Sequence, residues 1–295
     1  MTDRTFRFGV VAGQAGPADE WTTLVRRVED AGFSSLLNPD AFTVGAPFVA
    51  LAAAAAVTTS LRLGTFVLAA PLRTPAGIAW EAASLDRLSG GRFELGLGAG
   101  RPQAAAEADL LGVPFGTPGE RVDRLAGTIR GVRSLMTAAA HTADKHPGQA
   151  MAADAGLVPV QRPTPPIMIA GSGPKVLKLA AAEADIMSLA VNTEADLADR
   201  VTRLRELAGE RFGGIELNTN IFAVGDAVAP WMTSRFGVDP ARARDNQDLR
   251  VLNGDPATMA DVLRRRRDQF GVSYVLVNAF AWEKLAPVVA KLAGT

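Results

Sequence analysis

Short apolar runs alternate with stretches of helical periodicity along the whole chain, and this alternation restricts the fold more than any other feature. Runs of this length are typical of buried strands, and the longer stretches between them are typical of helices. A strand–helix–strand order implies parallel strands joined by right-handed crossovers. The predicted strands span residues 8–12, 35–38, 61–68, 93–97, 167–170, 186–190, 217–224 and 274–277. The predicted helices span residues 18–31, 47–58, 76–88, 118–136, 174–184, 194–212, 256–270 and 282–292.

Eight strands, each followed by a helix, predict a (β/α)8 TIM barrel of the α/β class. A single domain over residues 1–295 is expected, because no linker marks off a second domain and a doubly wound sheet would have fewer strands. Two segments lack the alternation. The first is an insertion after the fourth helix, at about residues 137–166. The second holds an expected short helix at 230–235 and a polar run at 241–250.

Composition excludes several function classes. The chain has 31 basic and 31 acidic residues, so no overall charge attracts nucleic acid or an acidic membrane. It has no cysteine, which excludes disulfides, thiolate metal sites and cysteine nucleophiles. The longest apolar run, 46–57, is too short to span a bilayer, and the first residues lack the apolar core of a signal peptide. We expect a soluble, cytoplasmic protein with a small-molecule substrate.

In a barrel of this type the active site lies where strands end and the following loops begin. The predicted strand ends offer one carboxylate, Asp40, and no histidine or pair of acids. The two histidines, His141 and His146, fall in the insertion instead. Such a set does not suit acid–base hydrolysis, and it offers too few ligands for a metal. We therefore expect no metal site.

The segment 167–175 is a candidate phosphate loop. A buried strand runs into the small residues Gly171, Ser172 and Gly173, and a helix then opens with proline in its first turn, where the missing N–H costs nothing. Free backbone N–H groups at such a helix start attract phosphate, and Lys175 adds a donor. The spacing is not that of a Walker loop. An ordinary strand-to-helix turn is the alternative.

Two charged residues near strand ends are weaker candidates for catalysis. Asp40 follows a predicted strand and could accept hydrogen bonds from a cofactor or substrate; a turn or N-cap aspartate is the alternative. Arg101 could hold an anion, or it could be a solvated or structural partner. The run of four arginines at 264–267 lies on a predicted helix, where a solvated face with pairing to acids is expected rather than a nucleic-acid site.

Several longer segments, in the right order, resemble one known family. The segment 61–100, LRLGTFVLAAPLRTPAGIAWEAASLDRLSGGRFELGLGAG, carries the most specific likeness. Five further segments add to the likeness: FRFGVVA, GFSSLLNPDAF, GVPFGTPGERVDRL, PVQRPTPPIMIAGSGPKVLKLAAAEAD and LNGDPATMADVLRRRRDQFGVSYVLV. The chain resembles the bacterial luciferase-like monooxygenase superfamily, and most of all its coenzyme F420-dependent oxidoreductase branch. The resemblance implies a luciferase-like TIM barrel with an insertion after helix 4, usually dimeric, that holds coenzyme F420 or FMN.

The resemblance also assigns positions for the coenzyme. The ring would rest against Phe66 and Val67, whose peptide bond is a non-proline cis bond in many relatives. Other positions that match coenzyme contacts are Asp40, Ala69, Ala99 and Gly100. The loop for the phosphate side of the coenzyme matches Gly171, Ser172, Gly173, Lys175 and Val176.

Two departures from the family pattern leave the proton donor or acceptor unassigned. Many deazaflavin relatives have a histidine directly after the aspartate of strand 2, where this chain has Ala41. A glutamate that moves a proton in the sugar-phosphate branch is matched by Arg101. The first hypothesis is hydride transfer between coenzyme F420 and a small, mostly apolar substrate. An FMN-dependent monooxygenase that uses reduced flavin and O2 is the second, and a flavin-binding protein with little turnover is the third.

Overall fold

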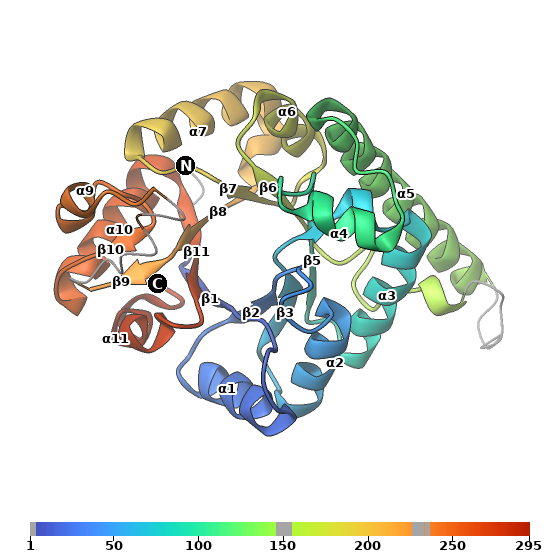
Figure 1. The fold of residues 1–295 in the computed structure, drawn as a ribbon, viewed down its shortest axis with the longest axis horizontal. Helices are drawn as coiled ribbons and strands as arrows, with labels where there is room; N and C mark the ends of the chain where they lie inside the picture. Colours follow the sequence, from blue (N-terminus) through green and yellow to red (C-terminus); the bar gives the residue numbers. More distant parts are fainter. Residues whose placement is uncertain (1–3, 146–154, 226–232, 234–236) are drawn as a thin grey trace. The chain divides into compact units, whose positions relative to one another are not determined.

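The computed structural model describes residues 4–145, 155–225, 233 and 237–295. Its main sheet has the strand order β3-β2-β1-β11-β8-β7-β6-β5-β4, and an additional pairing joins β3 to β5 (Figure 1). Parallel strands in this cyclic order, with helices between them, are a (β/α)8 TIM barrel. The predicted fold class is therefore confirmed.

The strands agree with the predicted positions, with two exceptions. The run 61–68 forms two short strands, and the run 217–224 divides into one strand of the main sheet and another that pairs with β10 in a separate two-stranded sheet. The bounds are β1 Arg7–Val11, β2 Ser35–Asn38, β3 Arg62–Thr65, β4 Leu68–Ala69, β5 Phe93–Gly98, β6 Ile167–Gly171, β7 Ile186–Leu189, β8 Glu216–Ile221, β9 Ala223–Val224, β10 Val251–Leu252 and β11 Val272–Asn278.

The helices differ more from the prediction. The α-helices are α1 Ala18–Asp30, α2 Pro47–Val57, α3 Pro75–Leu88, α4 Ala104–Leu111, α5 Pro118–Lys145, α6 Pro174–Glu183, α7 Glu194–Ala208, α9 Pro240–Arg244, α10 Pro256–Phe270 and α11 Trp282–Leu292. Short 3-10 helices are η1 Ala70–Leu72, η2 Ala155–Leu157 and η3 Gly209–Gly214. Within the described residues, no helix is both long enough and apolar enough to cross a membrane.

The insertion expected to start at residue 137 is partly helical, which corrects the prediction for its first residues. Helix α5 continues to Lys145 because alanines of high helix propensity follow Met136, and Ala139 and Ala140 are buried with it. Helix α4 was not predicted at all. The polar run 241–250 begins within α9, whereas the expected helix at 230–235 falls almost wholly outside the described residues.

The chain divides into two compact units. Unit 1 comprises residues 1–12, 26–36 and 170–295, and unit 2 comprises residues 13–25 and 37–169. The expectation of one domain remains a prediction.

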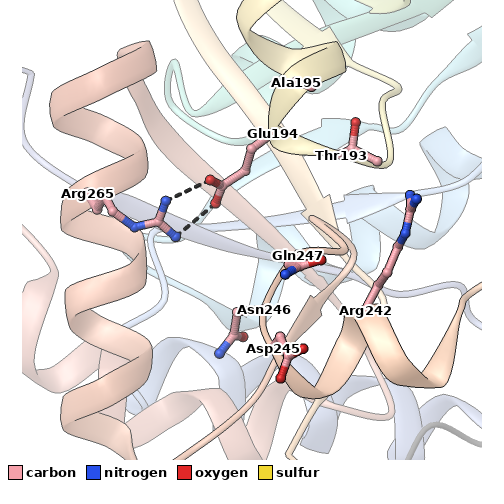
Figure 2. Close-up of a pocket in the computed structure, with 8 residues that line it drawn as sticks. All are labelled: Thr193, Glu194, Ala195, Arg242, Asp245, Asn246, Gln247 and Arg265. Atoms are coloured by element: carbon pink, nitrogen blue, oxygen red, sulfur yellow. Dashed lines mark hydrogen bonds and ion pairs between the residues drawn. The ribbon is translucent and has the colours of Figure 1, made fainter.

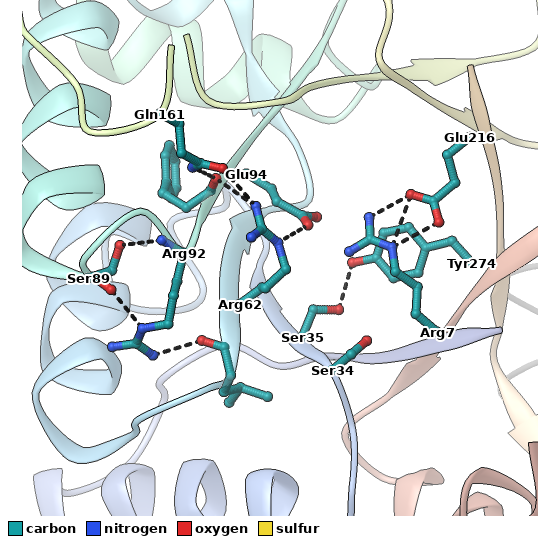
Figure 3. A network of polar contacts seen from close by, with 12 residues as sticks. Arg7, Ser34, Ser35, Arg62, Ser89, Arg92, Glu94, Gln161, Glu216 and Tyr274 are labelled. Carbon is teal, nitrogen blue, oxygen red and sulfur yellow. Dashed lines mark hydrogen bonds and ion pairs between the residues drawn. The ribbon is translucent and has the colours of Figure 1, made fainter. Parts of the chain in front are cut away.

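Unit 1 contains the parallel strands β1, β11, β8 and β7 in that order. Arg7 on β1 donates to Glu216 at the start of β8, with an Nη2–Oε2 distance of 2.7 Å, and its guanidinium lies 3.6 Å from the centre of the Tyr274 ring (Figure 3). The Tyr274 hydroxyl in turn lies 2.7 Å from Ser35 Oγ. Polar groups at the amino-terminal ends of these strands are thus paired with one another, as buried polar groups must be.

In unit 2, β3 pairs with the start of β5 and β4 pairs with its end, and helices α3 and α5 pack against β5. At the amino-terminal ends of these strands, Glu94 is buried and accepts a hydrogen bond of 2.6 Å from Arg62 Nε (Figure 3). Gln161 accepts from the same arginine and donates to Asp86 on α3. These polar contacts lie at the opposite strand ends from the expected coenzyme positions.

Candidate active site

The break between β3 and β4 forms the centre of the candidate site in unit 2. The Phe66–Val67 peptide bond is cis, as the resemblance to the luciferase-like family implied. Next to it, the Thr65 hydroxyl donates to Gly96 O at 2.8 Å and accepts from Gly96 N at 2.9 Å, so a side chain replaces the interrupted strand pairing. A Cβ atom at Gly96 would lie 1.9 Å from Thr65 O, so β5 can approach this closely only with glycine there.

The two residues of the cis bond are half-buried, whereas the strands around them are buried. Small residues occupy the ends of the two neighbouring strands: Ala69 ends β4, and Ala99 and Gly100 follow β5, where a Cβ at Gly100 would lie 3.8 Å from Ala69 Cβ. Half-buried apolar residues near strand ends that carry small residues are of the kind that contact a flat apolar ring.

The segment after β5 is held in place by a residue that sequence reasoning missed. Arg121 on α5 donates through Nε to Ala99 O at 3.1 Å, and its guanidinium lies 4.4 Å from the centre of the Phe115 ring. Both residues belong to the GVPFGTPGERVDRL segment that carries the family likeness, so a signal was present without an assigned role. The backbone at Ala99 and Gly100 is therefore fixed by a cation on a neighbouring helix.

Asp40, just after β2, is buried and fully engaged within the protein. Its Oδ1 pairs with Arg73 Nη2 at 2.9 Å, and its Oδ2 accepts from Ala69 N at 3.1 Å. Asp40 therefore ties the end of β2 to the end of β4, a bracing role that neither the ligand-binding interpretation nor its turn or N-cap alternative described. Arg73 lies 33 positions further along the chain, and nothing in the local pattern predicts this pairing.

The pairing with Asp40 also fixes the charge of Arg73. Burial alone lowers the pKa of a guanidinium, but the hydrogen bond and the charge of Asp40 raise the pKa of Arg73 by more. Glu81, 3.6 Å from Arg73 Nη1, adds to the same direction. Arg73 therefore stays cationic, and the brace is an ion pair.

Arg101 likewise has partners within the protein. Its Nη1 donates to Asp40 O at 3.1 Å, and its Nη2 pairs with Glu107 Oε1 at 2.5 Å. Glu107, on the unpredicted helix α4, also accepts from Phe42 N at 3.4 Å. Arg101 thus joins α4 to the loop after β2, which is the structural-partner role that the sequence left open.

The expected phosphate loop lies in unit 1, at the carboxyl end of β6. Gly171 has a φ of 149°, and Gly173 is the N-cap of α6, where it has no side chain that could cap the helix. Pro174 opens the helix as predicted. Lys175 is exposed and Val176 is buried. The loop therefore presents backbone N–H groups and one exposed cation, a combination that suits an anion.

Other expected positions contribute less. Ala41 is half-buried and His141 is exposed on α5, while His146 lies outside the described residues. Within the described part of the chain, no group of three or more His, Asp or Glu side chains is arranged to hold a metal ion.

A polar pocket of about 330 Å³ lies at the start of α7 (Figure 2). Glu194 and Arg265 both line it, and their side chains point toward each other with an Nη1–Oε2 distance of 2.6 Å. The predicted pairing of the four arginines at 264–267 with acids is thereby confirmed, since Arg264 pairs with Asp261 and Arg267 with Asp268 as well. Arg266 differs from the predicted solvated face, because it is buried against Glu194.

Comparisons with known proteins bear on both units. The model of the luciferase-like monooxygenase family matches residues 5–229, a range that includes every expected coenzyme position. A protein of Mycobacterium tuberculosis assigned by name to the coenzyme F420-dependent oxidoreductases is 33% identical over 175 residues, which are 57% of this chain and 50% of that protein. The chain spans about half the length of the curated relatives it matches.

Two solved structures share the fold over nearly the whole chain. A long-chain alkane monooxygenase has a TM-score of 0.79 at 16% identity, covering 99% of this chain and 92% of that one. An F420-dependent secondary alcohol dehydrogenase, solved with an F420–acetone adduct, has a TM-score of 0.75 at 17% identity, covering 98% of both chains. At such low identity, these likenesses show the shared fold alone.

Proposed function

Since this chain belongs to the luciferase-like monooxygenase family, we propose that it is an oxidoreductase that moves a hydride between coenzyme F420 and a small, mostly apolar organic substrate. The members of the family are oxidoreductases and monooxygenases, and the named mycobacterial relative supports the deazaflavin branch. What carries the proposal in this chain is the half-buried Phe66–Val67 peptide beside small residues and a braced Asp40.

The residues of unit 2 fit a tricyclic ring in two respects. The small residues Ala69, Ala99 and Gly100 would let a ring approach the backbone at the ends of β4 and β5. Asn38 Oδ1, at the end of β2, is buried and has no hydrogen-bond partner among the described residues, so an N–H group of a ligand would satisfy it.

When bound, coenzyme F420 supplies or accepts the hydride. The task of this chain is then to position the ring and exclude water. Phe66 and Val67 would support the ring face, and Ala69, Ala99 and Gly100 would allow its edge to approach the backbone. Arg121 and the Asp40–Arg73 pair hold that backbone in place, which is the pre-organisation that hydride transfer requires.

Asp40 and Arg101 are proposed as positioning residues rather than as an acid–base pair. Both oxygens of Asp40 and both terminal nitrogens of Arg101 are engaged by neighbouring groups. With alanine at position 41, the proton would come from solvent or from the substrate.

The phosphate of the coenzyme is proposed to bind the loop after β6, at Gly171, Ser172, Gly173, Lys175 and Val176. Its support is the uncapped start of α6, where free N–H groups and the positive end of the helix dipole favour an anion. The Ser172 hydroxyl and the Lys175 ammonium would add two donors to the backbone.

A specific observation also keeps an FMN-dependent monooxygenase in consideration. A matching segment of 95 residues is 36% identical to 4-hydroxyprotoasukamycin monooxygenase of Streptomyces nodosus subsp. asukaensis. FMN shares a tricyclic ring and a phosphate with the deazaflavin, so the same residues suit either coenzyme. A flavin-binding protein with little turnover is the remaining alternative.

Titration of the protein with each coenzyme, followed by a turnover assay, tests the proposal. Two results together would support the proposal: absorbance changes on addition of coenzyme F420, and hydride exchange with small alcohols, ketones or enones. FMN binding with oxygen uptake would favour the monooxygenase, and binding without any turnover would favour the third hypothesis. Either of the last two results would contradict the proposal.

A homodimer is also proposed. Trp80 and Leu88 lie two helical turns apart on α3 and are 63% and 70% exposed, and Val49 on the adjacent α2 is 72% exposed. Exposed large apolar side chains on two helices in contact are typical of an interface. Light scattering should give the mass of a dimer for the wild type and a shift toward monomer for Trp80→Ser. A cytoplasmic location, without nucleic-acid or membrane partners, stays a prediction.

A further inference from the structure

A second cavity lies in unit 1, at the amino-terminal ends of β8 and β11. Its volume is about 590 Å³, within the range of small-molecule sites. The phosphate loop follows the carboxyl end of β6, so the cavity is at the opposite end of the parallel strands of this unit. The proposed hydride transfer makes no use of it.

The inner wall of the cavity is apolar. Ile215 and Leu217, at the start of β8, line it and are 3% and 2% exposed. Phe212 and Phe270, which are half-buried, also line it. Such a wall favours an alkyl or aryl group over a sugar or an inorganic ion, because apolar surface gains most when it covers apolar surface.

Two arginines also line the cavity, and none of the described lining residues is acidic. Arg4 donates to Gly213 O at 3.0 Å, but its Nε is buried and has no hydrogen-bond partner among the described residues. Arg205 is exposed, and its guanidinium lies 4.8 Å from the centre of the Phe212 ring. A buried donor without a partner is costly, so this edge of the cavity is suited to an anion.

From these features we propose that the cavity binds a monocarboxylate with a short apolar chain. Its chain would cover Ile215 and Leu217, and its carboxylate would accept hydrogen bonds from Arg4 and Arg205. A guanidinium matches the planar geometry of a carboxylate, which favours this head group over a hydroxyl or an ammonium. The site is independent of the coenzyme, and the proposed function can fail without affecting it.

Calorimetric titration of the full-length protein with octanoate tests the proposal, with octanol as the uncharged counterpart. The variants are Arg205→Gln and Arg4→Gln. The matched control is Arg203→Gln, because Arg203 lies on the same helix, pairs with Glu206 and does not line the cavity. We expect octanoate to bind the wild type and the control equally. Loss of either cavity arginine should weaken binding about tenfold, as expected for one charged hydrogen bond.

Octanol should bind at least about tenfold more weakly than octanoate if the head group is recognised. Circular dichroism and thermal melting check that each variant is folded. If Arg4→Gln does not fold, the proposal is tested with Arg205→Gln alone. Absence of octanoate binding, or equal octanoate affinity in the wild type and Arg205→Gln, would overturn the proposal. Equal affinity for octanol and octanoate would overturn it as well.

Discussion

The two regions proposed to contact the coenzyme are built in different ways. In unit 2, charged side chains from three different segments fix the backbone: Arg73 pairs with Asp40, Arg101 reaches Asp40 O, and Arg121 holds Ala99 O. In unit 1, the loop at the start of α6 relies on glycines and unpaired N–H groups instead. A flat ring needs a wall of fixed shape, whereas a phosphate needs only donors that converge on it. Substitutions in unit 2 should therefore act through lost ion pairs or through the close approach of its strands, and those in unit 1 through the backbone conformation of the loop.

The largest effect is expected at Gly96. In Gly96→Ala, the added Cβ would meet Thr65 O at 1.9 Å, a backbone atom that cannot move without separating β5 from β3. We expect unfolding in urea at much lower concentration, with a loss of more than about 3 kcal/mol. Gly127→Ala on α5 is the control, because a Cβ there meets nothing within 4 Å and alanine favours the helix. Equal stability of the two variants would contradict the close approach of β5 to β3.

Asp40→Asn is expected to have the next largest effect. It leaves the Arg73 guanidinium, whose side chain is 26% exposed, without its main counter-charge. We expect a loss of about 1–3 kcal/mol in the free energy of unfolding and at least about tenfold weaker coenzyme binding. Glu81→Gln is the matched control, since Glu81 is the more exposed and more distant acid next to the same arginine; its effect should stay below about 0.5 kcal/mol. If Glu81→Gln weakened coenzyme binding as much as Asp40→Asn, the brace would not have the proposed role.

The loop of unit 1 should respond to backbone changes in a smaller range. Gly171→Ala introduces a Cβ at a φ of 149°, a conformation that costs about 1–3 kcal/mol with any side chain, and the loop should rearrange. Coenzyme affinity, measured by absorbance titration, should fall about tenfold with little change in melting temperature. Gly173→Ala, where φ is −69° and a Cβ meets nothing within 4 Å, should bind almost as well as the wild type. If Gly173→Ala weakened coenzyme binding more than Gly171→Ala, the proposal that the backbone of this loop binds the phosphate would be wrong.

The smallest effect concerns an ion pair of unit 1 outside the loop. Burial raises the pKa of Glu194, but hydrogen bonds from Arg265 and Arg266 lower it by more, so the pKa is below its usual value. The stabilisation is therefore complete above about pH 4.3, the unfolded value, and is lost as the pH falls through the lower folded value. Glu194→Gln should melt below the wild type at neutral pH, and the difference should shrink as the pH is lowered below about 4.3.

Partial exposure of the Glu194 pair to solvent keeps this difference small, below about 1 kcal/mol. Glu206→Gln is a control on the same helix, because Glu206 and Arg203 are both 59% exposed and their pairing should add little. A melting difference for Glu194→Gln that grows as the pH is lowered below about 4.3 would contradict the assigned pKa direction.

Much of the fold could be predicted because local patterns determine it. The predicted bounds match the structure for three elements: β2 at 35–38, α10 at 256–270 and α11 at 282–292. Each of them has clear apolar periodicity or a capping signal. The resemblance implied the cis bond at Phe66–Val67, but the division of the run 61–68 into β3 and β4 could not be predicted from local pattern, since it depends on contacts of the Thr65 hydroxyl with Gly96 from another strand. The extension of α5 was missed because alanines beyond Met136 carry no amphipathic pattern.

The candidate site was predicted in part, and mainly through the resemblance to a family. That likeness led to Phe66, Val67 and the loop after β6, whereas the strand-end argument led to Asp40. The partners Arg73, Glu107 and Arg121 were not found, because their contacts join residues that are between 6 and 33 positions apart and depend on the folded geometry.

Coenzyme discrimination tests the central claim most directly. The wild type, Asp40→Asn and Glu81→Gln are each titrated with coenzyme F420 and with FMN, and binding is measured by absorbance. The titrations compare ring binding with and without the Asp40–Arg73 pair. We predict tight binding of coenzyme F420 to the wild type and to Glu81→Gln, at least about tenfold weaker binding to Asp40→Asn, and weaker binding of FMN throughout. Tight FMN binding to the wild type without binding of coenzyme F420 would contradict the account.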